Sequence, residues 1–282
     1  MRSIRSHATG CVGLALATMI VMAGTAKADD QPFVTLYTTD VATAHERELE
    51  QWFGWSGGHA HESFNGFTSS SAFEYGITDD LQASLYLNYE WERLRTPPGP
   101  AETGDNAGLS GELIWRVMNV YFDPFGLAFY VEPGISAKER SFETKILLQK
   151  NFFNDKLRNA LNVNFEDVWS KNAIGGWDKS SALEFRLGSA YNITPEFSLG
   201  LEFGNEREFD GLVLGGSPTA AANSYFLGPT VQYIGRFATV TFGAQAQLPW
   251  ADNPSHVPGA VVDGYTADAE HFRMLLRFNK DL

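Results

Sequence analysis

S-A-F-E-Y-G-I-T-D-D-L-Q-A-S-L-Y-L-N-Y-E-W, residues 71–91, is the stretch that decides the fold. Two runs of alternating apolar and polar residues flank the turn-forming triplet Thr78-Asp79-Asp80. Side chains alternate between the two faces of a strand, so the stretch predicts a β-hairpin with one apolar and one polar face. The second run, extended by one residue, places Leu81, Ala83, Leu85, Leu87, Tyr89 and Trp91 on the apolar face and Gln82, Ser84, Tyr86, Asn88, Glu90 and Glu92 on the polar face.

The same rhythm continues along the chain and predicts about twelve strands. Long connections, including the proline-rich Arg95–Ala107 and the stretch Pro249–Glu270, alternate with short ones such as Asp123–Gly126. We expect Arg95–Ala107 to stay outside the sheet, because proline cannot donate to a strand ladder. The expected strands are Glu48–Trp55, Phe67–Ile77, Leu81–Leu94, Leu109–Phe122, Leu127–Ser136, Phe142–Phe153, Leu157–Trp169, Leu183–Ile193, Phe197–Phe209, Tyr225–Ile234, Phe237–Leu248 and His271–Asn279.

Strand length and loop alternation predict an all-β fold, a transmembrane antiparallel up-and-down β-barrel that occupies residues 29–282 as one domain. A tilted strand needs about 9–11 residues to cross a membrane, which the expected strands provide. A soluble β-sandwich is the alternative, with its apolar faces turned inward. Aromatic residues at strand ends favour the barrel, where such residues form girdles: Trp52, Trp55, Trp91, Tyr121, Phe122, Trp169, Tyr191, Phe209, Tyr233 and Trp250.

The N-terminus has the features of a secretory signal peptide, residues 1–28. Arg2 and Arg5 precede an apolar stretch, and Ala26-Lys27-Ala28 fits a small-x-small cleavage site. A single-pass anchor is the alternative, but the apolar stretch is shorter than the roughly 20 residues of a spanning helix. Cleavage after Ala28 would change the formal net charge from −13 to −16, which disfavours nucleic acid as a partner. It would also remove Cys11, the only cysteine, and with it any disulfide, thiol catalysis or cysteine-bound metal.

Charged residues on the polar strand faces are the candidate lumen or constriction residues. Either they form an ion-pair network that stiffens a narrow barrel, or they select the permeating solute. Because carboxylates predominate, selection would favour cations or neutral polar molecules over anions. The candidates are Glu90, Glu112, Arg116, Glu132, Lys145, Glu166, Glu184, Arg186, Glu202, Arg273 and Arg277.

Catalytic and metal sites are not predicted. His59-Ala60-His61-Glu62 has the residue types of a metal site, but no further ligand can be named, and a solvated extracellular loop is the preferred interpretation. A serine–histidine hydrolase would need a base beside its nucleophile, and no histidine lies with a serine in such a motif. An aspartate–histidine protease could recruit Asp210, Asp252 or His256 from loops, but the sequence does not place them together. We therefore expect neither enzymatic activity nor a cofactor.

Three motifs resemble Gram-negative outer-membrane β-barrels of uncharacterised or transporter type. Phe73–Leu81 resembles their Y-G-I-T-D-x-L element, and the likeness continues through Asp123–Leu127 and Val131–Gly134. The barrels associated with the phenol meta-degradation pathway are the nearest of these. The resemblance implies an outer-membrane barrel that acts as a channel, but it carries over no binding residues.

The expected function is passive, porin-like passage of small polar or aromatic solutes across the outer membrane. A closed barrel that acts through its loops, as an adhesin, a structural protein or a membrane enzyme, is the alternative. The expected partners are outer-membrane lipid, the solute and the barrel-assembly machinery. The last strand resembles the C-terminal signal which that machinery recognises, although the chain continues beyond it to Leu282.

Overall fold

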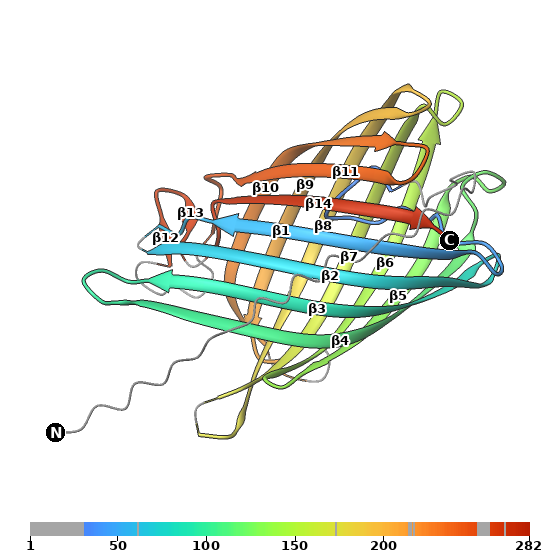
Figure 1. Ribbon diagram of the computed structural model, residues 1–282. Coiled ribbons are helices and arrows are strands. Elements are labelled where there is room, and N and C mark those ends of the chain that lie inside the picture. The colour runs from blue at the N-terminus through green and yellow to red at the C-terminus, as the bar shows by residue number, and fades with distance from the viewer. Residues whose placement is uncertain are drawn as a thin grey trace.

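Twelve strands close into one antiparallel barrel (Figure 1). The computed structural model describes residues 31–60, 62–172, 174–213, 216, 218–252, 260–267 and 269–282, so the predicted signal peptide lies outside the described residues. The predicted all-β barrel of twelve strands is confirmed. Its strands are β1 (Arg47–Gly57), β2 (Ser63–Thr78), β3 (Leu81–Arg95), β4 (Ala101–Met118), β5 (Gly126–Ser136), β6 (Glu139–Phe152), β7 (Leu157–Lys171), β8 (Trp177–Thr194), β9 (Phe197–Asp210), β10 (Thr219–Ile234), β11 (Thr239–Gln247) and β14 (Phe272–Asp281).

The first and last strands of the wall close the barrel. β1 pairs with β14 from Glu48 opposite Asp281 to Gly57 opposite Phe272, and β14 also pairs with β11. Closure leaves each of the twelve strands with two neighbours, which removes open sheet edges. The short strands β12 (Val261–Val262) and β13 (Tyr265–Thr266) form a separate two-stranded sheet, and in sequence they lie in the connection from β11 to β14.

The two ends of the barrel differ, and we name them by their connections. The turn end holds the β2–β3 hairpin turn, the start of β1 and the end of β14, and the loop end holds the connection between β11 and β14. Both termini of the wall lie at the turn end, where the backbone N–H of Leu282 donates to the carbonyl of Arg47 at 2.9 Å, as expected for an even strand count.

The faces of the wall follow the alternation in the sequence. Leu85 and Leu87 point outward and are 61% and 63% exposed, whereas Gln82 and Ser84 of the same strand are buried inside. An apolar outside around a polar inside is the pattern of membrane barrels and the reverse of a soluble sandwich. No helix long and apolar enough to cross a membrane occurs in the described part of the chain.

The predicted loop Arg95–Ala107 is wrong over most of its length. β4 starts at Ala101, immediately after the last proline of the stretch, and pairs with β3 from Ala101 opposite Arg95 onward. Beyond Pro100 every residue has a free backbone N–H, so the ladder can form despite the polar composition. The alternation of long and short connections is also less regular than predicted, because only residues 137–138 separate β5 from β6 at the loop end.

Trp52 was expected in an outer aromatic girdle, and that prediction is wrong. It lies on the inward face of β1, between the buried Glu50 and Gly54, and its ring lies 4.7 Å from the guanidinium carbon of Arg277. An indole can turn inward here because an inward-facing cation covers its ring.

Candidate functional site: the lumen and its plug

Residues 31–46 form what we call the plug segment, which lies inside the barrel except for the exposed Thr43–His45 at the turn end. They contain no strand, precede β1 directly, and pack against wall residues within seven positions of the turn end of their strands. Most of the segment is buried; Phe33, Val34, Leu36, Thr38 and Thr39 are at most 2% exposed. The plug segment therefore fills the turn-end half of the lumen.

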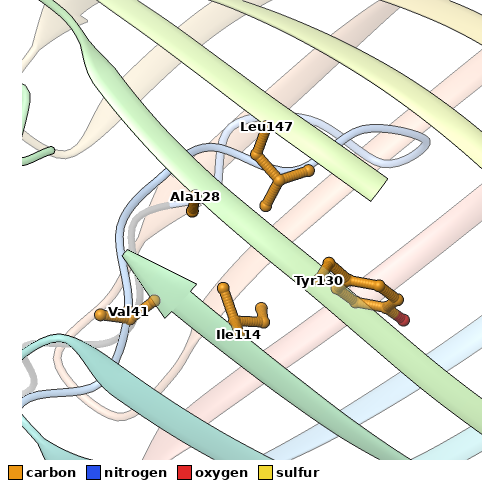
Figure 2. Packing of buried hydrophobic residues seen from close by; sticks show 5 residues of the cluster. All are labelled: Val41, Ile114, Ala128, Tyr130 and Leu147. Carbon is orange, nitrogen blue, oxygen red and sulfur yellow. The ribbon is translucent and has the colours of Figure 1, made fainter. Parts of the chain in front are cut away.

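Apolar side chains of the plug segment pack into two clusters on the inner wall. Val41 joins inward-facing Ile114, Ala128, Tyr130 and Leu147, as Figure 2 shows, with Tyr37 packed against this group.

The second cluster joins Phe33 and Leu36 of the plug segment to Ala160 and Ala190 of the wall. Gly188 makes room for it, because a Cβ there would lie 2.6 Å from a ring carbon of Phe33. The inward-facing wall residues that contact Phe33 and Leu36 thus have small, apolar side chains or none.

Wall side chains also bind the backbone of the plug segment. The carboxylate of Glu202 accepts hydrogen bonds from the backbone N–H groups of Val34 at 2.6 Å and Thr35 at 3.0 Å, and from the Thr35 hydroxyl. The amide of Asn162 both accepts from the Tyr37 N–H at 2.6 Å and donates to the Tyr37 carbonyl at 2.9 Å. These bonds replace the strand pairing that the plug segment lacks.

The same arrangement recurs nearer the turn end. Gln149 Oε1 accepts from the Thr39 N–H at 2.7 Å, and Gln82 Oε1 accepts from the Ala42 N–H at 2.7 Å. The anchors come from β3, β6, β7 and β9, so the plug segment is bound on several sides of the lumen.

Three charged networks surround the plug segment. In the first, Arg277 is ion-paired with Glu50, and both side chains are almost fully buried. The hydroxyl of Tyr86 donates to Glu112 at 3.1 Å and lies 3.4 Å from Glu50, which links β1, β3, β4 and β14.

The second network holds the ring of Tyr37. Lys145 Nζ lies 4.6 Å from the centre of this ring and 4.0 Å from that of Tyr130, and pairs with Glu143 at 3.0 Å. The Tyr130 hydroxyl donates to Glu132. A plug-segment aromatic ring therefore lies against a wall cation, a contact that favours the inserted position.

The third network lies above Glu202, toward the loop end. Arg186 pairs with Glu184 and with Glu206, both at 2.8 Å, and Arg273 pairs with Glu206 at 2.5 Å. Pairing of this kind compensates the cost of placing charges in a confined interior.

The structure thus gathers seven of the eleven predicted lumen residues into these networks, Glu202 binds the plug segment, and the other three lie apart. Arg116 is at the turn end, where it pairs with Asp80 at 2.9 Å. Glu90 and Glu166 lie nearer the loop end on the inward faces of β3 and β7.

The loop-end half of the lumen holds open space. One cavity of about 220 Å³ is lined by polar side chains that include Ser70, Asn88, Glu90, Glu132 and Glu139. A second, of about 290 Å³, is lined by Val34 and Thr35 of the plug segment together with wall residues that include Arg186 and Arg273, and with Glu270. Solute entering from the loop end would therefore meet a polar vestibule that stops at the plug segment.

The histidine motif gives no metal site among the described residues, where no group of three or more His, Cys, Asp or Glu side chains could hold a metal. His59 stacks on Phe64 with ring centres 4.2 Å apart, and its Nδ1 lies 3.8 Å from Glu62. His61 lies outside the described residues.

Sequence reasoning missed the plug segment. Its signal is present, since Phe33, Val34, Leu36 and Val41 cluster between the predicted cleavage site and the first strand. A solvated linker has no physical need for so many apolar residues in so short a stretch.

A model of a protein family matches most of the chain. Residues 25–273 match the family described as "Family of unknown function (DUF6662)". No curated protein matches the chain.

Solved structures of outer-membrane proteins share the fold. The COG4313 outer membrane channel from Pseudomonas putida F1 is 12% identical over 89% of this chain and 100% of that one, with a TM-score of 0.61. The translocator domain of the autotransporter NalP from Neisseria meningitidis is 10% identical over 86% and 90%, with a TM-score of 0.57. The NanC porin is 10% identical over 83% and 100%, with a TM-score of 0.52. At such identities the likeness shows an outer-membrane barrel fold, which a channel, a porin and a translocator domain have in common.

Proposed function

We propose that this chain, which belongs to the family of unknown function DUF6662, is a passive outer-membrane channel for small solutes that its own plug segment closes. The main support for this proposal is that the lumen is blocked by residues 31–46, which belong to none of the wall strands. The plug segment is continuous with the wall at the start of β1, and His45 and Glu46 at that end share backbone hydrogen bonds with Gly76 of β2. The rest of the segment is held through side chains of the wall. A barrier held in this way can move while the wall stays intact.

The solute class follows from the vestibule. Glu90, Glu132 and Glu139 line its cavity, and carboxylates in a confined entrance raise the local concentration of cations. We therefore propose small cations or neutral polar molecules as the solutes. Passage of an aromatic solute stays a prediction, and so does a relation to the phenol-pathway barrels.

The membrane orientation is part of the proposal. The turn end, with both termini of the wall, faces the periplasm, and the loop end faces outward, as in other barrels of this kind. The predicted signal peptide would direct export of the chain to the periplasm. Catalysis has no part in this function.

A disulfide lock tests the channel and its gate together. A Cβ built on Gly243 lies 3.4 Å from the Cβ of Val34, close to the separation in disulfides, and the only native cysteine lies in the predicted signal peptide. We expect the V34C/G243C variant in a planar bilayer to stay closed when oxidised and to conduct when reduced. The single variants V34C and G243C should be insensitive to the redox state.

The outcomes separate the two candidate functions. The closed, loop-acting barrel has support in the filled turn-end half of the lumen. If wild type and the reduced variant show no conductance across salts and voltages, the channel proposal fails. Equal conductance of the oxidised and reduced variant would leave a channel but remove the plug segment as its gate.

A further inference from the structure

Charges at the loop end separate by face of the wall. Along the loop-end thirds of β3, β6, β7, β8 and β9, the cations of the described strands that point outward are Arg93, Arg95, Arg140, Lys171, Lys179 and Arg207. The carboxylates there point mainly inward, among them Glu90, Glu92, Glu139, Glu206 and Glu208. In a chain with an excess of acidic residues, this places scarce positive charge on the membrane side of the rim.

Three of these cations form one cluster with two tryptophans. Arg140 of β6 pairs in register with Trp169 of β7, and Trp169 pairs with Lys179 of β8. In the next row toward the rim, Lys171 pairs with Trp177. We call these five residues the rim cluster.

The rim cluster is organised around the Trp177 ring. The Arg140 guanidinium carbon lies 4.8 Å from the ring centre and Lys171 Nζ lies 5.5 Å from it. Lys171 Nζ also donates to the Ala137 carbonyl at 2.8 Å. Cation–π contacts hold long side chains in place while leaving their charge uncompensated.

Among the carboxylates that the structure describes, none pairs with a cation of the rim cluster. Among the described residues, neither Arg140, Lys171 nor Lys179 has an ion pair within 4.0 Å. The outward-facing carboxylate that is nearest in register is Asp167, one row toward the middle of the wall and only 5% exposed. The rim cluster therefore keeps an excess of positive charge beside the membrane.

The position of the rim cluster beside an apolar face of the wall limits the class of ligand that can contact it. Strands lie about 4.8 Å apart, so the Cα atoms of Arg140 and Lys179 are about 10 Å apart, a span that their long side chains can close around a phosphate. Toward the middle of the wall the same face presents Phe142 and Leu183, which are apolar and lipid-facing. A ligand that touches both zones has an anionic head and acyl chains.

We propose that the rim cluster binds the phosphate-bearing headgroup of an outer-leaflet lipid, whose acyl chains lie against Phe142 and Leu183. This rests on the proposed orientation, in which the loop end faces outward. Tryptophan suits the site because its ring prefers the membrane–water interface. Arginine suits it because its planar guanidinium binds phosphate oxygens in pairs.

The test uses the R140Q/K171Q/K179Q variant and native mass spectrometry of the full barrel in detergent micelles with added lipid A. Each cation near a membrane surface contributes a factor of about five, so we expect about 100-fold weaker retention of lipid A by this variant. The matched control is K150Q/K156Q/R236Q, which removes three cations at the turn end and should bind like wild type. Dephosphorylated lipid A should be retained poorly by every form.

Further arms fix the ligand and the fold. The R140K/K171R/K179R variant, which keeps the charge, should retain lipid A, and a heat-dependent gel shift checks that each variant is folded. Equal retention by R140Q/K171Q/K179Q and the control would overturn the proposal. Displacement of lipid A by millimolar inorganic phosphate alone would also overturn it, because the site would then bind free phosphate without needing the lipid. Retention is scored without conductance, so a failed lipid site and a failed channel remain distinguishable.

Discussion

The turn-end half of the lumen is filled with chain, whereas the loop-end half is lined with carboxylates around open space. The wall is the same twelve strands in both halves, so strand number does not decide whether the lumen is open. About eight strands are filled by their own side chains and about sixteen leave a pore, and a barrel of twelve lies between these limits. Here an additional segment occupies the space that wall side chains leave. Closure at the turn end is therefore a property of residues 31–46.

The largest difference between the halves should appear in stability. Replacing Arg277 by methionine leaves Glu50 buried without its partner, which costs about 3–5 kcal/mol for pairs of this kind. Urea unfolding of the detergent-refolded barrel measures it. The loop-end counterpart is Lys138, which lies 3.8 Å from Asp105 with both side chains more than half exposed. We expect K138Q to change stability by less than about 1 kcal/mol. Similar midpoints for R277M and K138Q would contradict the difference between the halves.

The second largest effect should come from removing the hydrogen bonds that anchor the plug segment to Glu202. Glu202→Leu removes the acceptor for the N–H groups of Val34 and Thr35, and each buried group left without a partner costs about 1–3 kcal/mol. We expect the open probability in planar bilayers to rise about tenfold or more. Glu202→Gln keeps an acceptor oxygen and should have a smaller effect. An unchanged open probability in E202L would mean that this carboxylate does not anchor the plug segment.

The smallest effect concerns the vestibule. Glu90→Gln removes a charge that lines the loop-end cavity and touches no part of the plug segment, so it should change selectivity and leave gating alone. Because exposed charges are screened, we expect the cation-to-anion permeability ratio to fall only about twofold. Reversal potentials in a salt gradient measure this ratio. Asp105→Asn, on the outward face of the same rim, is the control and should leave the ratio unchanged.

Sequence patterning predicted the wall well and the contents of the lumen poorly. Strict alternation fixes which side chains of β3 face outward, because a shift of one residue would turn Leu85 and Leu87 into the lumen. The same alternation places Trp52 on the face of Glu48 and Glu50, so its inward orientation was overlooked although the pattern contained it. Its partner Arg277 could not be predicted, because it is distant in sequence and lies opposite Trp52 only when β1 pairs with β14. The start of β4 was misplaced because composition says little about where a paired backbone continues after its last proline.

The plug segment was missed for a related reason. Its conformation has no period, so no pattern within residues 31–46 specifies it. What holds it is Glu202, Asn162 and Gln149, side chains on three wall strands that approach one another only when the sheet closes. The individual lumen candidates could be named from one face of each strand, but their grouping into networks required the register.

The direct covalent link between the plug segment and β1 has a consequence for biogenesis. β1 and β14 lie at opposite ends of the wall sequence, so their pairing is the least local of the contacts in the wall and the slowest to be reached by chance. The plug segment must be enclosed by that pairing or thread in afterwards from the turn end. Until then Phe33, Val34 and Leu36 have no wall to cover them, and a nascent chain that stalls before its last strand is made would expose them to aggregation. Completion of the last strand is therefore the step that allows the wall to enclose these apolar side chains.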